Sequence, residues 1–114
     1  MDITFATKKL ENKLNEAKAM IRAHGAIRTK RLKILLTATR AAPNLATFAP
    51  PMSPPNRCHE LTGNLKGQLS MDLDRPYRLL FAPLHEPLPL REEGGLDWTS
   101  VTAINILKIE DTHG

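Results

Sequence analysis

A cluster of prolines divides this sequence into two parts of different character. Five of the nine prolines fall between residues 43 and 55. Proline lacks a backbone N–H and fixes φ, so this segment is predicted to be a loop, partly polyproline-like, and not a regular helix or strand. The loop separates a part with helical periodicity from a part with strand periodicity.

The part before the loop predicts one strand and two helices. Residues 2–6 alternate apolar with polar or small residues, which is typical of a short half-buried strand. A first helix is expected to follow Thr7 as N-cap and to stop at Gly25, and a second is expected over residues 27–42, ending at Pro43. The short link between them favours an antiparallel helical hairpin. The inward positions are predicted to be Leu10, Leu14, Ala17, Ile21, Leu32, Leu35, Leu36 and Thr39.

The part after the loop predicts an antiparallel sheet. Residues 67–73 alternate with period two, Asp74-Arg75-Pro76 can turn the chain, and residues 77–82 form the next strand of a hairpin. A polar loop over residues 84–99 precedes a last strand over 101–110, whose apolar residues on both faces indicate a central position. The predicted fold class is α+β, a single domain over residues 1–114 in the order β-α-α-β-β-β, with the hairpin packed on a small, mainly antiparallel sheet.

Composition excludes several classes of protein. Apolar residues make up 41% of the chain and charged residues 25%, which is ordinary for a folded domain. A single cysteine, Cys58, cannot form an internal disulfide, and we find no secretory leader. No apolar run approaches the roughly 20 residues that span a bilayer. A cytoplasmic protein without a membrane partner is expected.

Charge is distributed unevenly along the chain. Residues 1–40 hold ten Lys or Arg against three acidic residues, a net +7, whereas residues 41–114 hold six against nine, a net −3. The basic part is a candidate surface for a polyanion. The alternative is that these charges are the solvated outer faces of two amphipathic helices.

Three segments carry the most specific pattern in the sequence. Residues 57–64 form a polar, glycine-punctuated segment, predicted to be a loop, that contains His59. Residues 75–81 place Arg78 in a strand, and residues 106–113 end in Asp111-Thr112-His113. Together these segments resemble the plasmid maintenance killer (HigB) branch of the RelE/ParE toxin superfamily. The resemblance covers nearly the whole chain and implies a compact RelE-like fold with the helices behind one face of the sheet.

The resemblance also implies a function. Most relatives in that branch are toxins of type II toxin-antitoxin systems that act as ribosome-dependent mRNA endoribonucleases, or mRNA interferases, and so inhibit translation. A HigA-like helix-turn-helix antitoxin neutralises them. The partners expected for this chain are therefore that antitoxin, the ribosome and mRNA, with operator DNA reached only through the antitoxin.

RNA cleavage without a metal needs proton transfer and charge stabilisation. The 2′-hydroxyl attacks the adjacent phosphate, so one proton leaves, another is added, and the phosphorane carries extra charge. By position in the family pattern, Arg78 corresponds to the phosphate-binding arginine, while His59, Asp111 and His113 correspond to the family's histidines and acid. Proton transfer is assigned to His59 or His113. Candidate RNA-binding residues are Lys66, Arg57, Lys8, Lys9, Arg28, Lys30, Arg31 and Lys33.

The same residues have simpler interpretations. Arg78 could form a cross-strand ion pair with Asp72 or Asp74, and His59 could be an ordinary surface histidine. Trp98 and Tyr77 are most simply packing residues. Cys58 with scattered histidines lacks metal-ligand spacing, so no metal and no cofactor are expected.

Two departures from the family pattern keep other functions open. This chain has Thr62 where many relatives have lysine and Thr112 where most have tyrosine. One alternative is a non-enzymatic or degenerate toxin that acts by binding, either as a ParE-like gyrase inhibitor or as a co-repressor with its antitoxin. Another is a general basic RNA-binding module, although only 4% of the residues are aromatic and single-stranded RNA readers usually stack bases.

Overall fold

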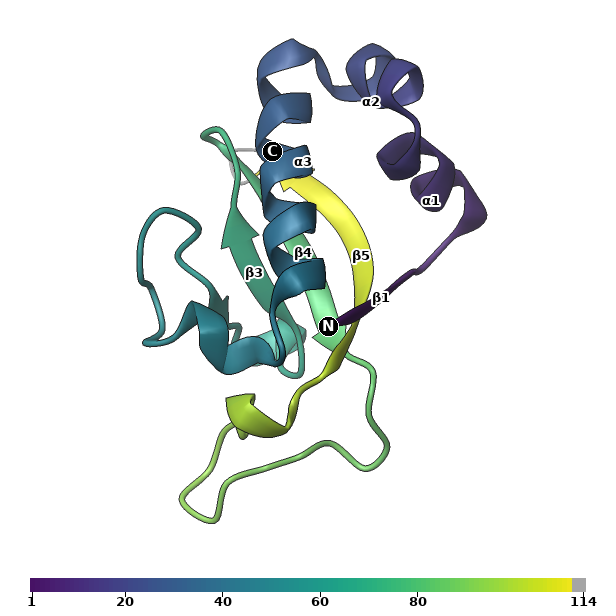
Figure 1. Ribbon diagram of the computed structural model, residues 1–114. Coiled ribbons are helices and arrows are strands. Elements are labelled where there is room, and N and C mark those ends of the chain that lie inside the picture. The colour runs from purple at the N-terminus through teal and green to yellow at the C-terminus, as the bar shows by residue number, and fades with distance from the viewer. Residues whose placement is uncertain (112–114) are drawn as a thin grey trace.

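A five-stranded sheet forms the centre of the molecule (Figure 1). The computed structural model describes residues 1–111, apart from the side chain of Ala17. The spatial order of the strands is β1-β5-β4-β3-β2; β1 runs parallel to β5, and the other neighbours are antiparallel. The strands are β1 (Asp2–Phe5), β2 (His59–Glu60), β3 (Leu69–Asp72), β4 (Tyr77–Pro83) and β5 (Ala103–Asp111).

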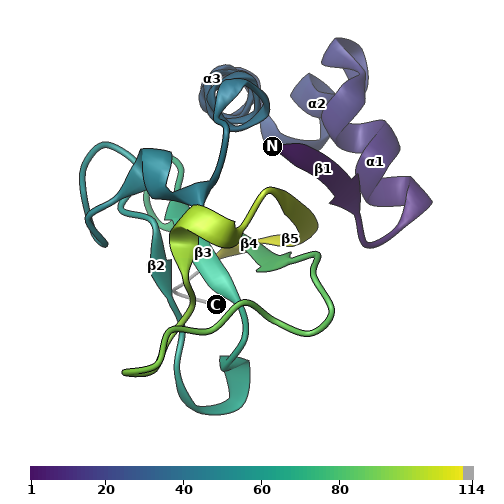
Figure 2. The same cartoon turned by 60° about the horizontal axis from the view of Figure 1, so that its bottom comes forward.

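Three α-helices accompany the sheet, α1 (Lys8–Asn15), α2 (Ala17–His24) and α3 (Ala26–Ala41). Helix α3 lies across one face of the sheet, while α1 and α2 lie beside the β1 edge (Figures 1 and 2). Short 3₁₀ turns occur at η1 (Leu45–Phe48), η2 (Gly63–Leu65) and η3 (Trp98–Ser100). The predicted α+β class with a mainly antiparallel sheet is confirmed. No helix of the described residues has the length and apolar character needed to cross a bilayer.

The predicted first helix is broken into two. Thr7 caps it as expected, since its Oγ1 accepts a hydrogen bond from the Leu10 N–H at 3.1 Å. At Glu16, however, the backbone is extended, with φ −110° and ψ 122°, so α1 ends and α2 starts in a new direction. The break changes which residues face inward: Met20 is 3% exposed and Ile21, predicted inward, is 49% exposed.

The second predicted helix is confirmed as α3. Gly25 adopts φ +81°, a conformation that favours glycine, and it closes α2 and opens α3 in a single residue. The helix ends at Ala41, because Ala42 precedes Pro43 and a residue before proline is disfavoured in the helical conformation. The four predicted inward residues are all buried, namely Leu32, Leu35, Leu36 and Thr39.

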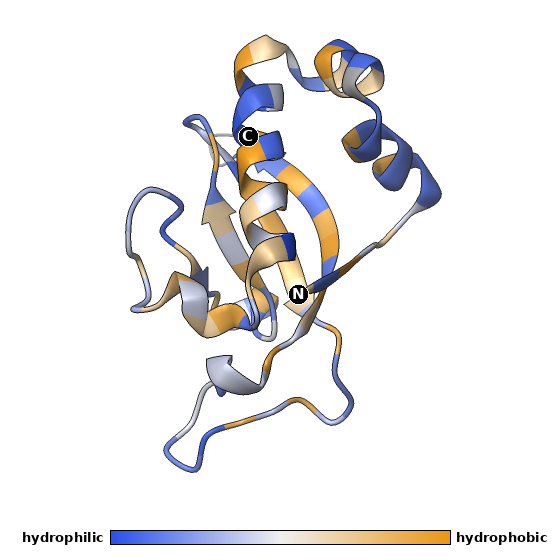
Figure 3. Cartoon of the chain, viewed as in Figure 1, coloured by the Kyte–Doolittle hydropathy of each residue, from blue (hydrophilic) through white to orange (hydrophobic). Residues whose placement is uncertain are grey.

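The core fills the space between α3 and the sheet. Leu32 and Leu35 of the helix, Met71 of β3, Phe81 of β4 and Ile106 of β5 are each at most 1% exposed. In Figure 3 the apolar colour gathers on the strands behind α3, whereas α1 is largely hydrophilic. Burying each such side chain stabilises the fold by roughly 1.5–3 kcal/mol. The interior position of β5, between β1 and β4, confirms the prediction of a central last strand.

Two loops gain structure that the pattern did not predict. The proline-rich segment contains η1, which Asn44 caps by accepting a hydrogen bond from the Ala46 N–H at 2.9 Å. The segment predicted to be a loop around His59 contains β2. Its second residue, Glu60, accepts hydrogen bonds from the Leu96 N–H at 3.0 Å and from Trp98 Nε1 at 3.2 Å. Glu60 thereby attaches the long loop before β5 to the sheet, and Trp98 packs in the core, as predicted.

Candidate active site

A concave cleft opens where β2, β3 and β4 meet the turn between β3 and β4. Its volume is about 370 Å³. Three of the predicted site residues line it together, Arg57, His59 and Arg78. The remaining lining residues are Asp72, Arg75, Pro76 and Tyr77.

Strand register explains why these side chains meet. Asp72 lies opposite Arg78 in the β3–β4 ladder, and Ser70 lies opposite His59 in the β2–β3 ladder. Directly opposed residues of antiparallel strands share a face of the sheet, and so do residues two apart along a strand. His59 and Arg78 are therefore on the same face, but β3 lies between their strands, so they are offset by about 7 Å along the strands and by about 10 Å across them.

Arg78 is held by a glutamate on the neighbouring strand. Its Nε donates to Glu110 Oε2 at 2.8 Å, and its Nη2 lies 2.6 Å from the same oxygen. Both side chains are about one-quarter exposed. The hydrogen bond from Arg78 holds the pKa of Glu110 below its usual value. A cross-strand pair was the simpler interpretation of Arg78, and the pair exists, but with Glu110 in place of Asp72 or Asp74.

His59 has a defined orientation. Its Nδ1 lies 2.7 Å from the Arg57 carbonyl oxygen. Because a carbonyl only accepts hydrogen bonds, Nδ1 carries the proton, and in the neutral ring Nε2 keeps a free lone pair. That Nε2 is 3.5 Å from Ser70 Oγ, at the outer limit of a hydrogen bond. His59 is thus arranged to accept a proton at Nε2.

The backbone before β2 places Arg57 over the cleft. Arg57 has φ +48°, which is uncommon for a residue other than glycine, and its N–H donates to the Ser53 carbonyl at 2.8 Å. Its Nη1 lies 3.3 Å from Asp72 Oδ2. The side chain is 40% exposed and can therefore also reach a ligand.

Arg28 faces the interior of the molecule, not the solvent as the sequence predicted. Its guanidinium carbon lies 3.3 Å from the centre of the Tyr77 ring. Its Nε and Nη2 donate to the two carboxylate oxygens of Asp74, at 3.0 and 3.2 Å. The side chain is 17% exposed. Arg28 therefore joins α3 to the β3–β4 turn, and its charge is largely offset by Asp74.

The other predicted residues lie outside the cleft lining. Lys66 is exposed just after η2, near the start of β3, whereas the cleft is at the end of that strand. Lys8 is exposed and pairs with Glu11 at 2.8 Å. Asp111 ends β5 opposite Tyr77 in the β4–β5 ladder. His113 and Thr112 lie outside the described residues. The remaining basic candidates are exposed on the helices, namely Lys9, Lys30, Arg31 and Lys33.

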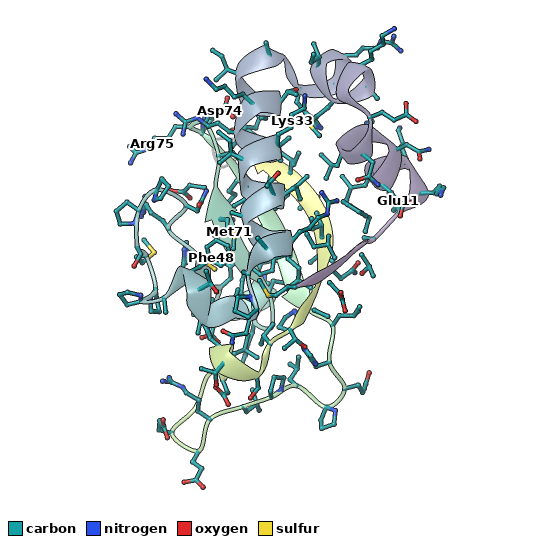
Figure 4. The ribbon with its side chains drawn as sticks, viewed as in Figure 1. Glu11, Lys33, Phe48, Met71, Asp74 and Arg75 are labelled. Atoms are coloured by element: carbon teal, nitrogen blue, oxygen red, sulfur yellow. The ribbon has the colours of Figure 1, made fainter. Side chains whose placement is uncertain are left out.

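Several cleft residues were not assigned from the sequence as functional. Arg75 extends outward from the turn between β3 and β4, where Asp74 lies near α3 (Figure 4). Tyr77, predicted to be a packing residue, contacts the core and also lines the cleft. Glu110 is identified only by the structure, in which it lies opposite Arg78 in the β4–β5 ladder. The hairpin signal at residues 69–82 would have placed Asp72 and Arg78 opposite each other, but the pairing with β5 has no comparable local signal.

Cys58 is not available for chemistry in this structure. It is 1% exposed, and burial raises the pKa of its thiol to about 12. Within residues 1–111, no three His, Cys, Asp or Glu side chains stand close enough to hold a metal ion.

Solved structures of known proteins share this architecture. One is described as a YoeB/ParE toxin from Agrobacterium tumefaciens, with a TM-score of 0.57 and 11% identity over 97% of this chain and 98% of that chain. Others are a YoeB-YefM complex and a YoeB dimer from Staphylococcus aureus, each with a TM-score of 0.52 and 16% identity over 96% of this chain and 94% of that chain.

Sequence comparison adds nothing to these structural similarities. No family model matches the chain, and no curated protein matches it. Similarity at this level of identity shows the fold, and the sequence-based prediction of a RelE-like architecture is confirmed. The HigB branch stays a prediction. Three helices packed on a five-stranded mixed sheet, matched over nearly the full length of these toxins, give the chain the fold of the RelE/ParE-type toxins.

Proposed function

We propose that this chain is the toxin of a type II toxin-antitoxin system and that it cleaves mRNA on the ribosome as a metal-independent endoribonuclease. The observation that supports this most is the single cleft lined by Arg57, His59 and Arg78 on the open face of a RelE-like sheet. The cleft combines a base with a defined tautomer and guanidinium groups suited to phosphate. These are the groups that cleavage by a 2′-hydroxyl requires.

His59 is the proposed general base. Its Nε2 takes the proton from the 2′-hydroxyl as that oxygen attacks the adjacent phosphorus. The Arg57 carbonyl, 2.7 Å from Nδ1, then stabilises the imidazolium that forms. The hydrogen bond also limits rotation of the ring, so Nε2 keeps its place, 3.5 Å from Ser70 Oγ.

Arg78 is the proposed stabiliser of the phosphorane. Glu110 accepts a hydrogen bond from its Nε and lies 2.6 Å from its Nη2, which orients the guanidinium and leaves other N–H groups for a phosphate. Arg57 and Arg75, on the other walls, would hold flanking phosphates. Because these groups are preorganised, they stabilise developing charge without reorganisation during the reaction.

The leaving 5′-oxygen needs a proton. His113 is the proposed donor, and Asp111 is the acid of the family pattern two residues before it in the sequence. Asp111 is at the end of β5, opposite Tyr77, which itself lines the cleft. The end of β5 therefore runs toward the wall of the cleft where the leaving group would lie.

The proposed partners follow from this function. A structural neighbour from S. aureus is described as a complex of YoeB with YefM, and by analogy we propose that an antitoxin protein of HigA-like type binds this chain, which reaches operator DNA only through it. The site of action would be the ribosome in the cytoplasm. Exposed lysines and Arg31 outside the cleft are proposed to contact ribosomal RNA phosphates, namely Lys8, Lys9, Lys30, Arg31, Lys33 and Lys66.

A second candidate function is inhibition by binding alone. Two arginines of the cleft are already paired with carboxylates, Arg78 with Glu110 and Arg57 with Asp72, which reduces the positive charge offered to RNA. One structural neighbour is also described as YoeB/ParE. A ParE-like gyrase inhibitor, or a co-repressor acting with the antitoxin, would use the fold without the chemistry.

The deciding experiment is mRNA cleavage on programmed 70S ribosomes. Wild type is compared with Arg78→Ala and with Arg91→Ala, a matched loss of one charge in the loop over residues 84–99, away from the cleft. We expect cleavage in the decoding site by wild type and Arg91→Ala, and at least about a 100-fold loss with Arg78→Ala. Absence of cleavage by folded wild type, together with inhibition of gyrase supercoiling or retained antitoxin binding, would replace the enzyme by the binding function.

A further inference from the structure

A second cavity at the surface is separate from the cleft just described and larger than it. It is a groove of about 450 Å³ between α3 and the end of the proline-rich loop. Its lining residues are Ile27, Lys30, Arg31, Ile34, Pro55, Asn56 and Asp72. None of these side chains belongs to the hydrophobic core.

Helix α3 is apolar on two faces, and one of them is uncovered. Its inner face packs on the sheet, but Ile27 and Ile34 on the outer face are 71% and 61% exposed. They are seven residues apart, so they lie on one stripe, about 10.5 Å from each other along the helix, and exposed Ala38 continues that stripe. Isolated exposed aliphatic residues are common, but two that line the same groove mark a surface suited to a partner.

The groove is bordered by positive charge. Helix α3 contains no acidic residue, and Lys30 and Arg31 lie between the two isoleucines. Asp72, the acidic residue of the lining, is paired with Arg57. An occupant that satisfies this surface presents aliphatic side chains to Ile27 and Ile34 and carboxylates to Lys30 and Arg31.

The exposed isoleucines favour a protein over RNA as the occupant of the groove, so Lys30 and Arg31, proposed above as contacts to ribosomal RNA, face a protein when the groove is filled. Phosphate contacts alone would need only Lys30 and Arg31, and RNA bases are usually recognised by aromatic or hydrogen-bonding side chains. Ile27 and Ile34 offer neither. We propose that the groove is the docking site for an acidic amphipathic helix of a partner protein, with aliphatic residues at i and i+7 aligned with Ile27 and Ile34.

The groove adjoins the candidate active site through one residue. Asp72 lines both cavities, and its carboxylate pairs with Arg57 of the cleft. An acidic occupant of the groove therefore lies next to the cleft and repels an RNA phosphate there. This consequence rests on the proposed function, whereas the docking itself does not.

The test uses a labelled designed peptide. A helix of about 18 residues, built from Leu, Glu and Ala with leucines on one stripe, is compared by fluorescence polarisation with a peptide of the same composition whose leucines are scattered. We expect wild type to prefer the striped peptide. Ile27→Gln with Ile34→Gln, and separately Lys30→Glu with Arg31→Glu, are each expected to weaken binding by about tenfold or more.

A matched control reverses the same amount of charge elsewhere. Lys9→Glu with Lys33→Glu changes two exposed lysines that do not line the groove and should alter peptide affinity by less than about threefold. Circular dichroism and the melting temperature confirm that each variant folds. All substituted side chains are on the surface. A loss of peptide binding in a variant that still folds would therefore show that the peptide binds in the groove.

Three results would overturn the proposal. The first is equal or undetectable binding of the striped and scattered peptides. The second is a wild-type dimer that the isoleucine substitutions dissociate, since a second copy would then occupy the groove. The third is an effect of Lys30 and Arg31 on binding to oligouridine with none on the peptide, which would assign the surface to RNA. Peptide binding requires no mRNA cleavage, so failure of the proposed enzyme leaves this test intact.

Discussion

Arg78 of β4 and Glu110 of β5 lie directly opposite each other on neighbouring strands, and one carboxylate oxygen accepts a hydrogen bond from Nε and lies 2.6 Å from Nη2. The arrangement fixes a cation at the wall of an open cleft while part of its hydrogen-bonding capacity stays unused. Glu110 therefore has two opposing effects on a bound phosphate. It orients Arg78, and it weakens the attraction that Arg78 exerts.

The first prediction separates these two effects. Glu110→Gln keeps a carbonyl oxygen that can orient Arg78 but removes the negative charge, so a non-cleavable RNA dinucleotide should bind about 2–5-fold more tightly. Calorimetric titration measures the affinity, and Glu93→Gln in the exposed loop is the matched control. Unchanged binding would show that Arg78 does not contact the phosphate, and weaker binding would show that the charge of Glu110 is needed to orient Arg78.

The second prediction concerns His59 as the base. His59→Gln should lower the rate of mRNA cleavage by about 100-fold or more, because the proton acceptor at Nε2 is lost. Ser70→Ala, which removes a hydroxyl 3.5 Å from Nε2, should change the rate by less than about fivefold. Equal losses in both variants would mean that the effect is structural.

The third prediction concerns Arg28, Asp74 and the stability of the fold. Arg28→Ala should lower the free energy of unfolding by about 1–2 kcal/mol, since the bidentate pair is partly buried and the guanidinium covers the Tyr77 ring. Arg28→Lys should recover little, because lysine lacks the planar fork. A double-mutant cycle with Asp74→Ala in urea measures the coupling. Additive losses would show that the pair contributes nothing of its own.

The fourth prediction concerns Glu60 and the loop that it holds, with Trp98 as a fluorescent probe. Glu60→Ala leaves the buried Trp98 Nε1 and the Leu96 N–H without their acceptor, which should cost about 2–3 kcal/mol and release the loop over residues 84–99. Glu60→Gln should keep part of that stability. The emission maximum of Trp98 should shift to longer wavelength in Glu60→Ala. An unshifted spectrum and an unchanged melting temperature would show that the loop is held by packing alone.

The fifth prediction is a pH dependence of stability. Burial lowers the pKa of His24, and Arg28 and Lys13 lower it further, with a small opposing effect of Asp74. Its Nε2 is buried without a hydrogen-bond partner among the described residues. The unfolded chain therefore binds the proton more readily, so stability should fall as the pH drops below about 6.5. Urea unfolding at pH 7.5 and 5.5 should show this loss, and a smaller one in His24→Asn.

The local sequence pattern was sufficient to predict a helix boundary where a single residue type determines the backbone conformation. Thr7, Gly25 and Pro43 bounded helices as predicted, and alternation located β3 and β4. The break at Glu16 was missed because the apolar spacing continues through it and no glycine or proline marks it. The two segments pack on different neighbours, α1 on β1 and α2 on α3, and this tertiary packing overrides the local periodicity.

The sequence predicted which residues form the candidate site better than it predicted the contacts that these residues make. Arg57, His59 and Arg78 were named from the pattern and do line one cleft. Their partners were not, because Glu110 reaches Arg78 through strand pairing between residues far apart in the sequence. Arg28 was expected on the outer face of its helix from the helical periodicity, and its stacking on Tyr77 depends on how α3 lies against the β3–β4 turn.

The parallel pairing of β1 with β5 has a consequence for the order of synthesis. Asp2 to Phe5 leave the ribosome about a hundred residues before their partners, Ala103 to Ile106. Contacts of such long sequence separation form slowly, and β4 also lacks one neighbour until then. Glu110 belongs to the same late strand, so a nascent chain has no Arg78–Glu110 pair. A chain whose proposed target is the ribosome thus cannot complete its cleft until β5 has been synthesised.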